Sequence, residues 1–218
     1  MRLGGAAFAA ALLLAIAGAG AQESSGESSL EIGFWKRLSS HELLYFPISE
    51  TRASETDHAE GLVGVGYDRA LDSTLSVRAG YRYIRELTPP EGERAYVEHR
   101  AVGELFVRPW PGARLDMVDR SRLELRWVDG DPSWRFRNRV RLGRVIPRRR
   151  IISVTPYGTV EGTYDSHYRT INRVRLSLGA VLRLTRRLGA DLYLARQQDT
   201  RSDAPKMASS GLTLNFYF

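Results

Sequence analysis

Cysteine is absent from the 218 residues, and lysine occurs only as Lys36 and Lys206. Without cysteine the chain can form neither a disulfide framework nor a thiolate metal site. The sequence also lacks a phosphate-binding glycine loop, a dinucleotide fingerprint and the spacing of a metal-ligand motif. We therefore expect no cofactor and no bound metal, and a chain without disulfides must be stabilised by a core or by membrane embedding.

Long apolar runs are missing after residue 21, where no stretch approaches the ~20 apolar residues of a transmembrane helix. The first 21 residues differ from the rest. Arg2 precedes an Ala/Leu-rich run that ends in Ala19-Gly20-Ala21. This layout is typical of a secretory signal peptide, and it predicts cleavage after Ala21.

What the chain does have is strict alternation of polar and apolar residues. The stretch 134–142 reads WRFRNRVRL, in which four arginines alternate with mostly apolar side chains. In an extended strand this pattern places the arginines on one face and the apolar residues on the other. A transmembrane barrel satisfies both faces, with the apolar side toward lipid and the arginines toward the lumen.

Segments of this kind fill the chain from residue 42 onward, with short connections alternating with longer, more polar ones. This alternation is typical of an up-and-down outer-membrane barrel. We therefore predict an all-β fold, an antiparallel transmembrane β-barrel over residues 42–218. The ten expected strands lie near residues 42–54, 60–70, 74–84, 94–107, 121–127, 134–142, 151–164, 173–184, 188–199 and 208–218.

Residues 22–41 have two interpretations. The stretch 30–38, LEIGFWKRL, could form an extra strand, which would need a partner for even parity and would raise the count to twelve. It could equally be an N-terminal segment that packs against one mouth of the barrel. The sequence alone leaves both open.

The last residues, LTLNFYF, also alternate, with Leu212, Leu214, Phe216 and Phe218 on one face. A strand that ends in Phe at an outward position is typical of the C-terminal strand of bacterial outer-membrane barrels. We therefore expect a monomer in the bacterial outer membrane. Its partners would be membrane lipid and the barrel-assembly machinery, which would contact the strand ending at Phe218.

Six motifs lie along the predicted strands, namely AGYRYI at 79–84, EHRAVGELFV at 98–107, RSRLELRW at 120–127, RFRNRVRL at 135–142, PYGTVEG at 156–162 and INRVRLSLG at 171–179. Through these motifs the chain resembles a domain-of-unknown-function family of Gram-negative outer-membrane β-barrel proteins. The resemblance runs from about Tyr67 to Phe218 and implies a barrel fold and an outer-membrane location. It implies no reaction and no binding residues.

Alternation also predicts which charged side chains face the lumen. Unpaired arginines in a narrow lumen would repel one another, so we expect them to be interleaved with carboxylates. Folding each hairpin about its turn gives the row Glu124, Arg137, Glu161 and Arg173, and a second row of Arg82, Glu98 and Arg122. Further basic residues expected in the lumen are Arg135, Arg139, Arg141 and Arg175.

We interpret these rows as an ion-paired belt that holds the strands together and narrows any channel. The alternative is a small anion-preferring channel, because inward basic residues outnumber inward acidic ones. Nucleic-acid binding is disfavoured despite the net charge of +7, since the arginines alternate with apolar residues and the signal peptide directs the chain to export.

A third hypothesis is an acyl hydrolase on the lipid-facing surface. Parity places His99 on that face, and folding about Pro109–Gly112 brings Ser121 opposite it, with Asp119 nearby. A Ser–His–Asp arrangement can activate a serine for acyl transfer. No oxyanion hole is identifiable, and the balance favours a protein without catalytic activity.

Overall fold

The computed structural model describes residues 26–54, 58–89, 92, 94–112, 114–146, 153–200 and 207–218. The expected signal peptide at 1–21 lies outside these residues. Eleven β-strands run through the described part of the chain. They are β1 (Gly26–Arg37), β2 (Glu42–Ala53), β3 (Ala59–Ala70), β4 (Leu75–Glu86), β5 (Val97–Val107), β6 (Leu115–Val128), β7 (Asp131–Arg144), β8 (Ser153–Asp165), β9 (Thr170–Arg183), β10 (Leu188–Asp199) and β11 (Met207–Tyr217).

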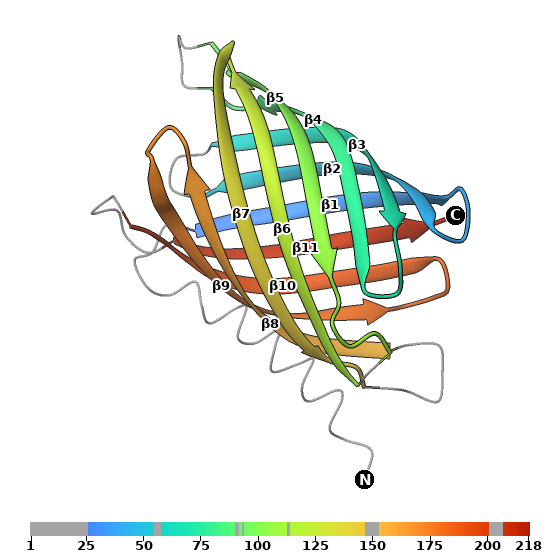
Figure 1. Ribbon diagram of the computed structural model, residues 1–218. Helices are drawn as coiled ribbons and strands as arrows, with labels where there is room; N and C mark the ends of the chain where they lie inside the picture. The colour runs from blue at the N-terminus through green and yellow to red at the C-terminus, as the bar shows by residue number, and fades with distance from the viewer. Residues whose placement is uncertain are drawn as a thin grey trace.

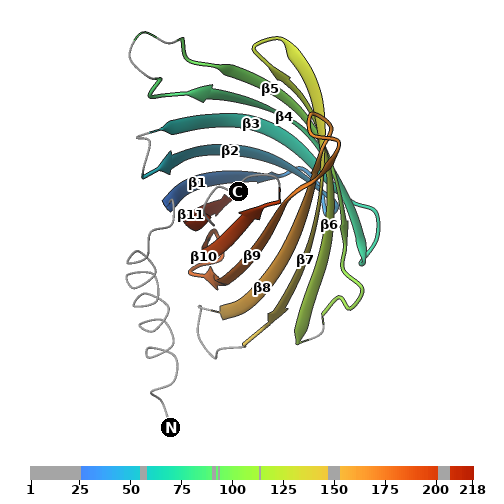
Figure 2. The same ribbon diagram turned by 90° about the vertical axis from the view of Figure 1, so that its left-hand side faces the viewer.

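The strands close into one barrel in which each strand lies beside its neighbours in the chain (Figure 1). Consecutive strands pair antiparallel. The barrel closes through a parallel contact between β1 and β11, which runs from Gly26 opposite Ala208 to Trp35 opposite Tyr217 (Figure 2). Closure matters because an exposed strand edge is a template for aggregation, and a closed barrel has none.

In the part of the chain that the structure describes, no helix is long and apolar enough to cross a membrane.

The predicted fold class is confirmed, and the count of eleven lies between the predicted ten and twelve. Of the two interpretations of residues 22–41, the extra strand is the one observed, so the barrel begins at Gly26 rather than at residue 42. The expectation that this strand needs a further partner is wrong. Because β1 pairs with β2 on one side and in parallel with β11 on the other, it closes the barrel without a twelfth strand.

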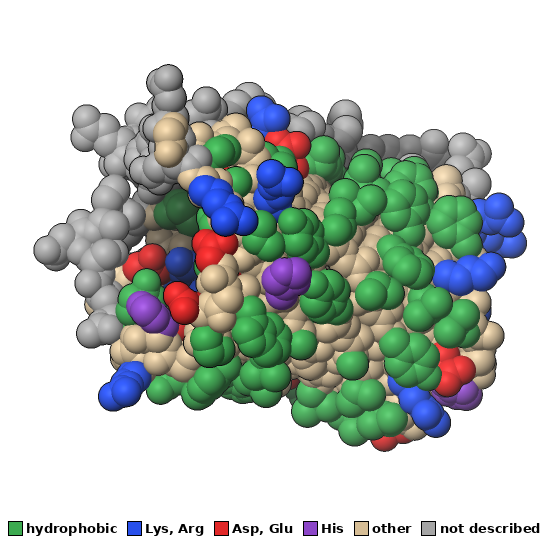
Figure 3. Space-filling view, turned by 90° about the horizontal axis from the view of Figure 1, so that it is seen from above, with side chains coloured by type: hydrophobic (Ala, Val, Ile, Leu, Met, Phe, Trp, Pro, Cys, Tyr) green, Lys and Arg blue, Asp and Glu red, His purple; other side chains and the backbone are tan. Residues whose placement is uncertain are grey.

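The two faces of each strand differ as the alternation predicts. On β7, Trp134, Phe136 and Leu142 are exposed on the outside, while Arg135 and Arg137 point inward and are half-buried. The outer face in Figure 3 is covered largely by hydrophobic side chains. The largest fully buried side chains are charged, namely Glu124, Glu161 and Asp165. The interior of this barrel is therefore polar.

Candidate functional site

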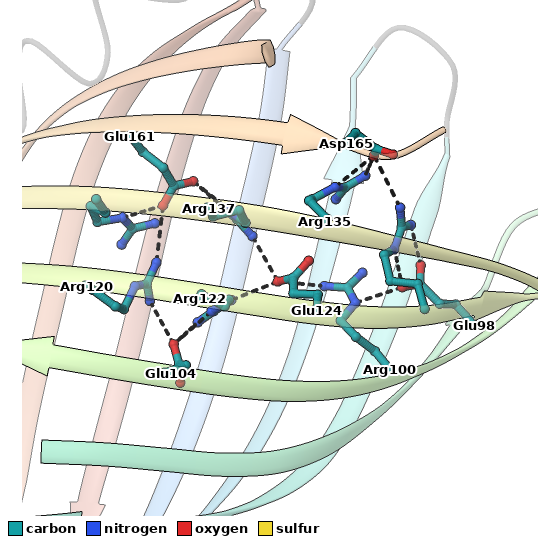
Figure 4. A network of polar contacts seen from close by, with 12 residues as sticks. Glu98, Arg100, Glu104, Arg120, Arg122, Glu124, Arg135, Arg137, Glu161 and Asp165 are labelled. Atoms are coloured by element: carbon teal, nitrogen blue, oxygen red, sulfur yellow. Dashed lines mark hydrogen bonds and ion pairs between the residues drawn. The ribbon is translucent and has the colours of Figure 1, made fainter. Parts of the chain in front are cut away.

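Inward-facing side chains of β4 to β8, with one from β3, form a single network of ion pairs inside the barrel. Figure 4 shows the members that come from β5 to β8. Every second residue of each strand points inward, and neighbouring strands are close enough for an arginine to reach across to the next one. We call this set the lumen network. Its members are Asp68, Arg78, Glu98, Arg100, Glu104, Arg120, Arg122, Glu124, Arg126, Arg135, Arg137, Arg139, Glu161 and Asp165.

A closed ring of alternating charges forms the centre of the network (Figure 4). Each of its three carboxylates contacts two of its three arginines, and each arginine bridges two carboxylates. We call this the central ring. In order around the ring the residues are Glu104, Arg122, Glu124, Arg137, Glu161 and Arg120.

Glu124 is the most buried member of the ring, because the whole residue is 0% exposed, against 5% for Glu104 and 2% for Glu161. Its Oε1 atom lies 3.3 Å from Arg122, 3.4 Å from Arg137 and 3.6 Å from Arg100. Its other oxygen, Oε2, is buried without a hydrogen-bond partner among the described residues. A buried carboxylate costs several kcal/mol to desolvate, so the three guanidinium groups are what allow it to stay charged here.

Glu161 has a similar environment on β8. Its carboxylate accepts hydrogen bonds from Arg137 Nε at 3.1 Å, Arg139 Nε at 2.6 Å and Arg120 Nη2 at 3.2 Å. Charge-assisted bonds of this kind are about twice as strong as neutral ones. Glu161 therefore ties β8 to both β6 and β7.

Glu104 links the ring to the end of the barrel at which the chain terminates. It accepts a hydrogen bond from Arg122 Nε at 2.8 Å and lies 3.2 Å from Arg78 Nη1. Arg78 also bonds Asp68 at 2.9 Å. Its guanidinium lies over the rings of Trp35, Tyr45 and Phe106, at 5.0, 5.2 and 4.8 Å from their centroids. These cation–π contacts hold Arg78 in the lumen.

Toward the opposite end, two further carboxylates complete the network. Glu98 receives a bidentate pair from Arg126, with both N–O distances 2.7 Å, and a third bond of 2.7 Å from Arg100. Asp165 accepts bonds of 3.0 and 2.9 Å from Arg135 and lies 3.7 Å from Arg126. The network thus runs along much of the lumen wall.

Eight arginines and six carboxylates make up the lumen network, so it carries a surplus of two positive charges. The central ring by itself is neutral. Because each carboxylate of the central ring contacts at least two guanidinium groups, removal of one arginine leaves its carboxylates with fewer partners rather than with none. The arrangement can hold strands in place and obstruct the lumen.

The predicted row of Glu124, Arg137 and Glu161 is present as ion pairs, but its register differs from the predicted one. Glu124 lies opposite Arg135, and Arg137 lies opposite Thr163, so both pairs in the row form diagonally. Between β6 and β7 the reason is the two-residue turn Asp129-Gly130, which is shorter than the predicted 129–132 connection. The resulting slip of two residues preserves the faces.

The predicted place of Arg173 at the end of this row is wrong. A register shift between Thr163 and Tyr164 moves the pairing of β8 with β9, and Glu161 lies opposite Arg175. Arg173 instead bonds Asp199 on β10 at 2.9 Å. Arg175 donates to Ser209 at 2.8 Å.

The second predicted row, Arg82, Glu98 and Arg122, does not form. Arg82 lies opposite Arg100 and makes no ion pair within the described residues, whereas Glu98 lies two positions farther along β5. Of the other basic residues predicted in the lumen, Arg135 and Arg139 belong to the lumen network. Arg141 instead forms a separate pair with Asp116 at 2.6 Å.

Several network members were not among the predicted site residues. Alternation was a sufficient signal for Arg100, Glu104 and Arg126, because each lies an even number of residues from a predicted inward residue of the same strand. Arg120 has the same parity as Arg122. Asp165 lies at a predicted loop position, and only the observed end of β8 places it in the lumen.

The predicted hydrolase residues are not brought together. Ser121 lies opposite Leu105, whereas His99 lies opposite Trp127, about 20 Å farther along the strand. Leu115–Val118 extend β6 beyond the end of β5 and pair only with β7, which shifts the register. Asn138 Nδ2 donates to Asp119 at 2.7 Å and to Ser121 at 3.1 Å. His99 contacts the Tyr81 hydroxyl.

Solved structures that share this fold include LpxR from Salmonella typhimurium, which superposes with a TM-score of 0.58 at 11% identity, over 85% of this chain and 87% of that one. The beta domain of the Bordetella autotransporter BrkA gives a TM-score of 0.55 at 15% identity, over 80% and 82%. Both are outer-membrane β-barrels. At these identities the likeness concerns the fold alone.

No curated protein matches the chain. The family model described as "Protein of unknown function (DUF2490)" matches residues 40–208, which spans β2 to β10 and therefore every member of the lumen network. The motifs that resemble an uncharacterised barrel family lie within this range. The chain belongs to the DUF2490 family of proteins of unknown function.

Proposed function

We propose that this protein is an outer-membrane β-barrel whose lumen network holds the strands together and closes the lumen between its two ends. The observation that carries the proposal is the burial of the central ring. The side chains of Glu104, Glu124 and Glu161 are at most 2% exposed, although they face the inside of a barrel. In an open water-filled pore such carboxylates would be solvated.

Three observations support the location in the outer membrane. The outer face is apolar, the interior is charged, and the structures of similar fold are outer-membrane barrels. Membrane lipid would cover the outer face. The barrel-assembly machinery would contact β11, whose pattern ends at Phe218, and the protein would be a monomer exported by the signal peptide at 1–21.

Planar-bilayer recording tests the proposal. We expect the purified full-length protein to insert without steady conductance, because a lumen closed by the central ring would leave no continuous path for ions. Heat-modifiable mobility on a gel checks that the barrel is folded, and flotation with lipid vesicles checks that it inserts, so a silent bilayer is not mistaken for an empty one.

The second candidate is a small anion-preferring channel, which the surplus of two arginines in the lumen network favours. A steady current whose reversal potential in a salt gradient shows anion preference would overturn the closed-lumen proposal and support this alternative. A steady current without ion preference would contradict both.

A further inference from the structure

Arg82 on β4 is a lumen arginine without a partner. It lies an even number of residues from Arg78 on the same strand, so the two side chains share the inward face. Every other inward-facing arginine of β4 to β8 has an ion pair. Arg82 makes no ion pair, hydrogen bond or cation–π contact within the described residues. The five N–H donors of its guanidinium group therefore have no acceptor in that part of the chain.

The residues around Arg82 explain why the protein supplies no partner. In the cross-strand register it lies between Gly64 on β3 and Arg100 on β5. The inward-facing residues on either side of it along β4 are Gly80 and Ile84. None of these four neighbours carries a carboxylate, so a negative charge at this position has to come from elsewhere.

The nearest carboxylate in the register is already occupied. Glu98 lies diagonally opposite Arg82, two positions along β5 from Arg100. It accepts three bonds of 2.7 Å, two from Arg126 and one from Arg100. Figure 4 shows Glu98 enclosed by these two guanidinium groups. Glu98 is therefore committed to other arginines and leaves Arg82 unpaired.

Arg82 also completes a row of like charges. Arg82, Arg100 and Arg126 lie directly opposite one another on β4, β5 and β6. Like charges that face each other directly on neighbouring strands are destabilising. Glu98 offsets the charges of Arg100 and Arg126, whereas no described residue offsets that of Arg82. A negatively charged ligand beside Arg82 would reduce this repulsion and satisfy the free donors.

An anion can approach this row from the end of the barrel where β1 begins. A cavity of about 520 Å³ lies at that end, and Arg100 is one of its lining residues. Because Arg100 lies directly opposite Arg82, the cavity extends to the strand next to Arg82. Side chains fill much of the interior of a barrel of about this strand number, so a small anion is the ligand that fits.

We propose that Arg82, together with the remaining N–H donors of Arg100, binds a small inorganic anion such as chloride inside the barrel. The anion supplies the negative charge that Gly64 and Gly80 cannot supply. A cation would add to the positive row. This binding site goes beyond the structural role of the lumen network. It needs no path through the lumen, so the conductance measured in planar bilayers does not decide it.

The stability of the unmodified full chain in chloride tests the proposal. Urea titrations of the refolded barrel are compared in sodium chloride and in sodium gluconate at equal ionic strength, because gluconate has the same charge but is much larger. A ligand that binds only the folded state stabilises it, so about 100 mM chloride should raise the folding equilibrium constant about tenfold for a Kd of about 10 mM. Equal stability in the two salts would overturn the proposal, whatever any variant does.

A matched pair of variants places the anion. Arg82→Gln should abolish the chloride response and leave the stability in gluconate no lower, because Arg82 has no carboxylate partner to lose. Arg175→Gln removes the same charge from β9, five strands away across the lumen. Arg175 also lacks a carboxylate partner, but it donates to Ser209, so this variant should keep the chloride response.

Three outcomes in the variants would contradict the site. A full chloride response in Arg82→Gln would place the anion elsewhere. Equal losses of the response in Arg82→Gln and Arg175→Gln would show a general effect of positive charge in the lumen. A marked loss of stability of Arg82→Gln in gluconate would show that Arg82 has a partner within the protein.

Discussion

At the scale of single residues, the members of the central ring act together, because each charged side chain contacts two others of opposite charge. Arg137 bridges Glu124 and Glu161, and Arg122 bridges Glu104 and Glu124. Removing one member leaves two partners buried and incompletely paired. Removing one member of a buried ion pair destabilises a protein by more than the intact pair stabilises it, because the remaining charge stays buried without a partner.

This sharing predicts strong coupling between Glu161 and Arg137. We expect Glu161→Ala and Arg137→Ala each to lower the free energy of unfolding by about 3–5 kcal/mol. The double variant should lose less than the sum by about 1–3 kcal/mol, because it removes both members of the pair. Urea titration of the refolded barrel, followed by tryptophan fluorescence, measures the cycle.

The control for this cycle is the ion pair of Glu50 and Arg52, whose side chains are 40% and 70% exposed. Exposed pairs contribute at most about 1 kcal/mol, so their two alanine variants should have small effects and little coupling. Additive losses at Glu161 and Arg137 would show that the two residues act independently and would contradict the shared ring.

At the scale of elements, turn geometry determines which charges meet. The hairpin between β6 and β7 turns on Asp129 and Gly130, whose φ angles are 49° and 95°. Two consecutive positive φ angles are the mark of a type I′ turn, which suits a two-residue hairpin. The register of the two longest neighbouring strands of the network therefore depends on this turn.

Gly130→Ala should lower the free energy of unfolding by about 1 kcal/mol, because alanine is strained at positive φ. Gly103→Ala on β5 is the matched control. In both cases a new Cβ atom meets nothing within 4 Å, but Gly103 has no positive φ. Urea titration of both variants separates backbone strain from crowding, and equal losses would contradict this explanation.

The turn between β3 and β4 is held by Asp72. Its Oδ1 atom accepts bonds from the backbone N–H of Thr74 and of Leu75, at 2.6 and 2.8 Å, and from the Thr74 hydroxyl at 2.7 Å. Because the Thr74 hydroxyl and these backbone N–H groups stabilise the charged form, the pKa of Asp72 lies below its usual value.

A lowered pKa in the folded state means that the charged form contributes stability above the ordinary pKa of aspartate, and that this contribution is lost as the pH falls through the lowered value. Asp72→Ala should therefore lower the urea midpoint at neutral pH, and its difference from the parent should shrink in acid. Titrations at several pH values test this. A difference that stays constant with pH would show that the carboxylate charge is not involved.

At the scale of the whole molecule, the parallel contact between β1 and β11 closes the barrel. It replaces two exposed edges by one ladder in which Leu30 lies opposite Leu212. An odd number of strands follows directly, since the first and last strands must run the same way.

The chain has no cysteine, so an engineered disulfide can test this closure on a clean background. We expect Leu30→Cys with Leu212→Cys to oxidise readily, because opposed residues in adjacent strands lie within the reach of a disulfide. The shifted pair Leu30→Cys with Phe216→Cys should not. Mobility on a non-reducing gel and mass spectrometry report the link, and equal cross-linking of both pairs would contradict the parallel register.

The sequence by itself determined which side chains share a face. In WRFRNRVRL the alternation places Arg135 and Arg137 inside and Trp134 and Phe136 outside, and a slip of two residues does not change this assignment. The barrel class, the charged interior and the membership of Glu124, Arg137 and Glu161 follow from the same period. Faces are a local property of the chain, and local sequence is sufficient to determine them.

Only the tertiary structure decided which charges meet and how the barrel closes. The partner of Arg173, the separation of His99 from Ser121 and the pairing of β1 with β11 each depend on turn length, register shifts or contacts between distant parts of the chain. A long arginine also reaches diagonal partners as easily as opposite ones. The central ring therefore exists because the four strands β5 to β8 are held side by side in one register, which no single segment encodes.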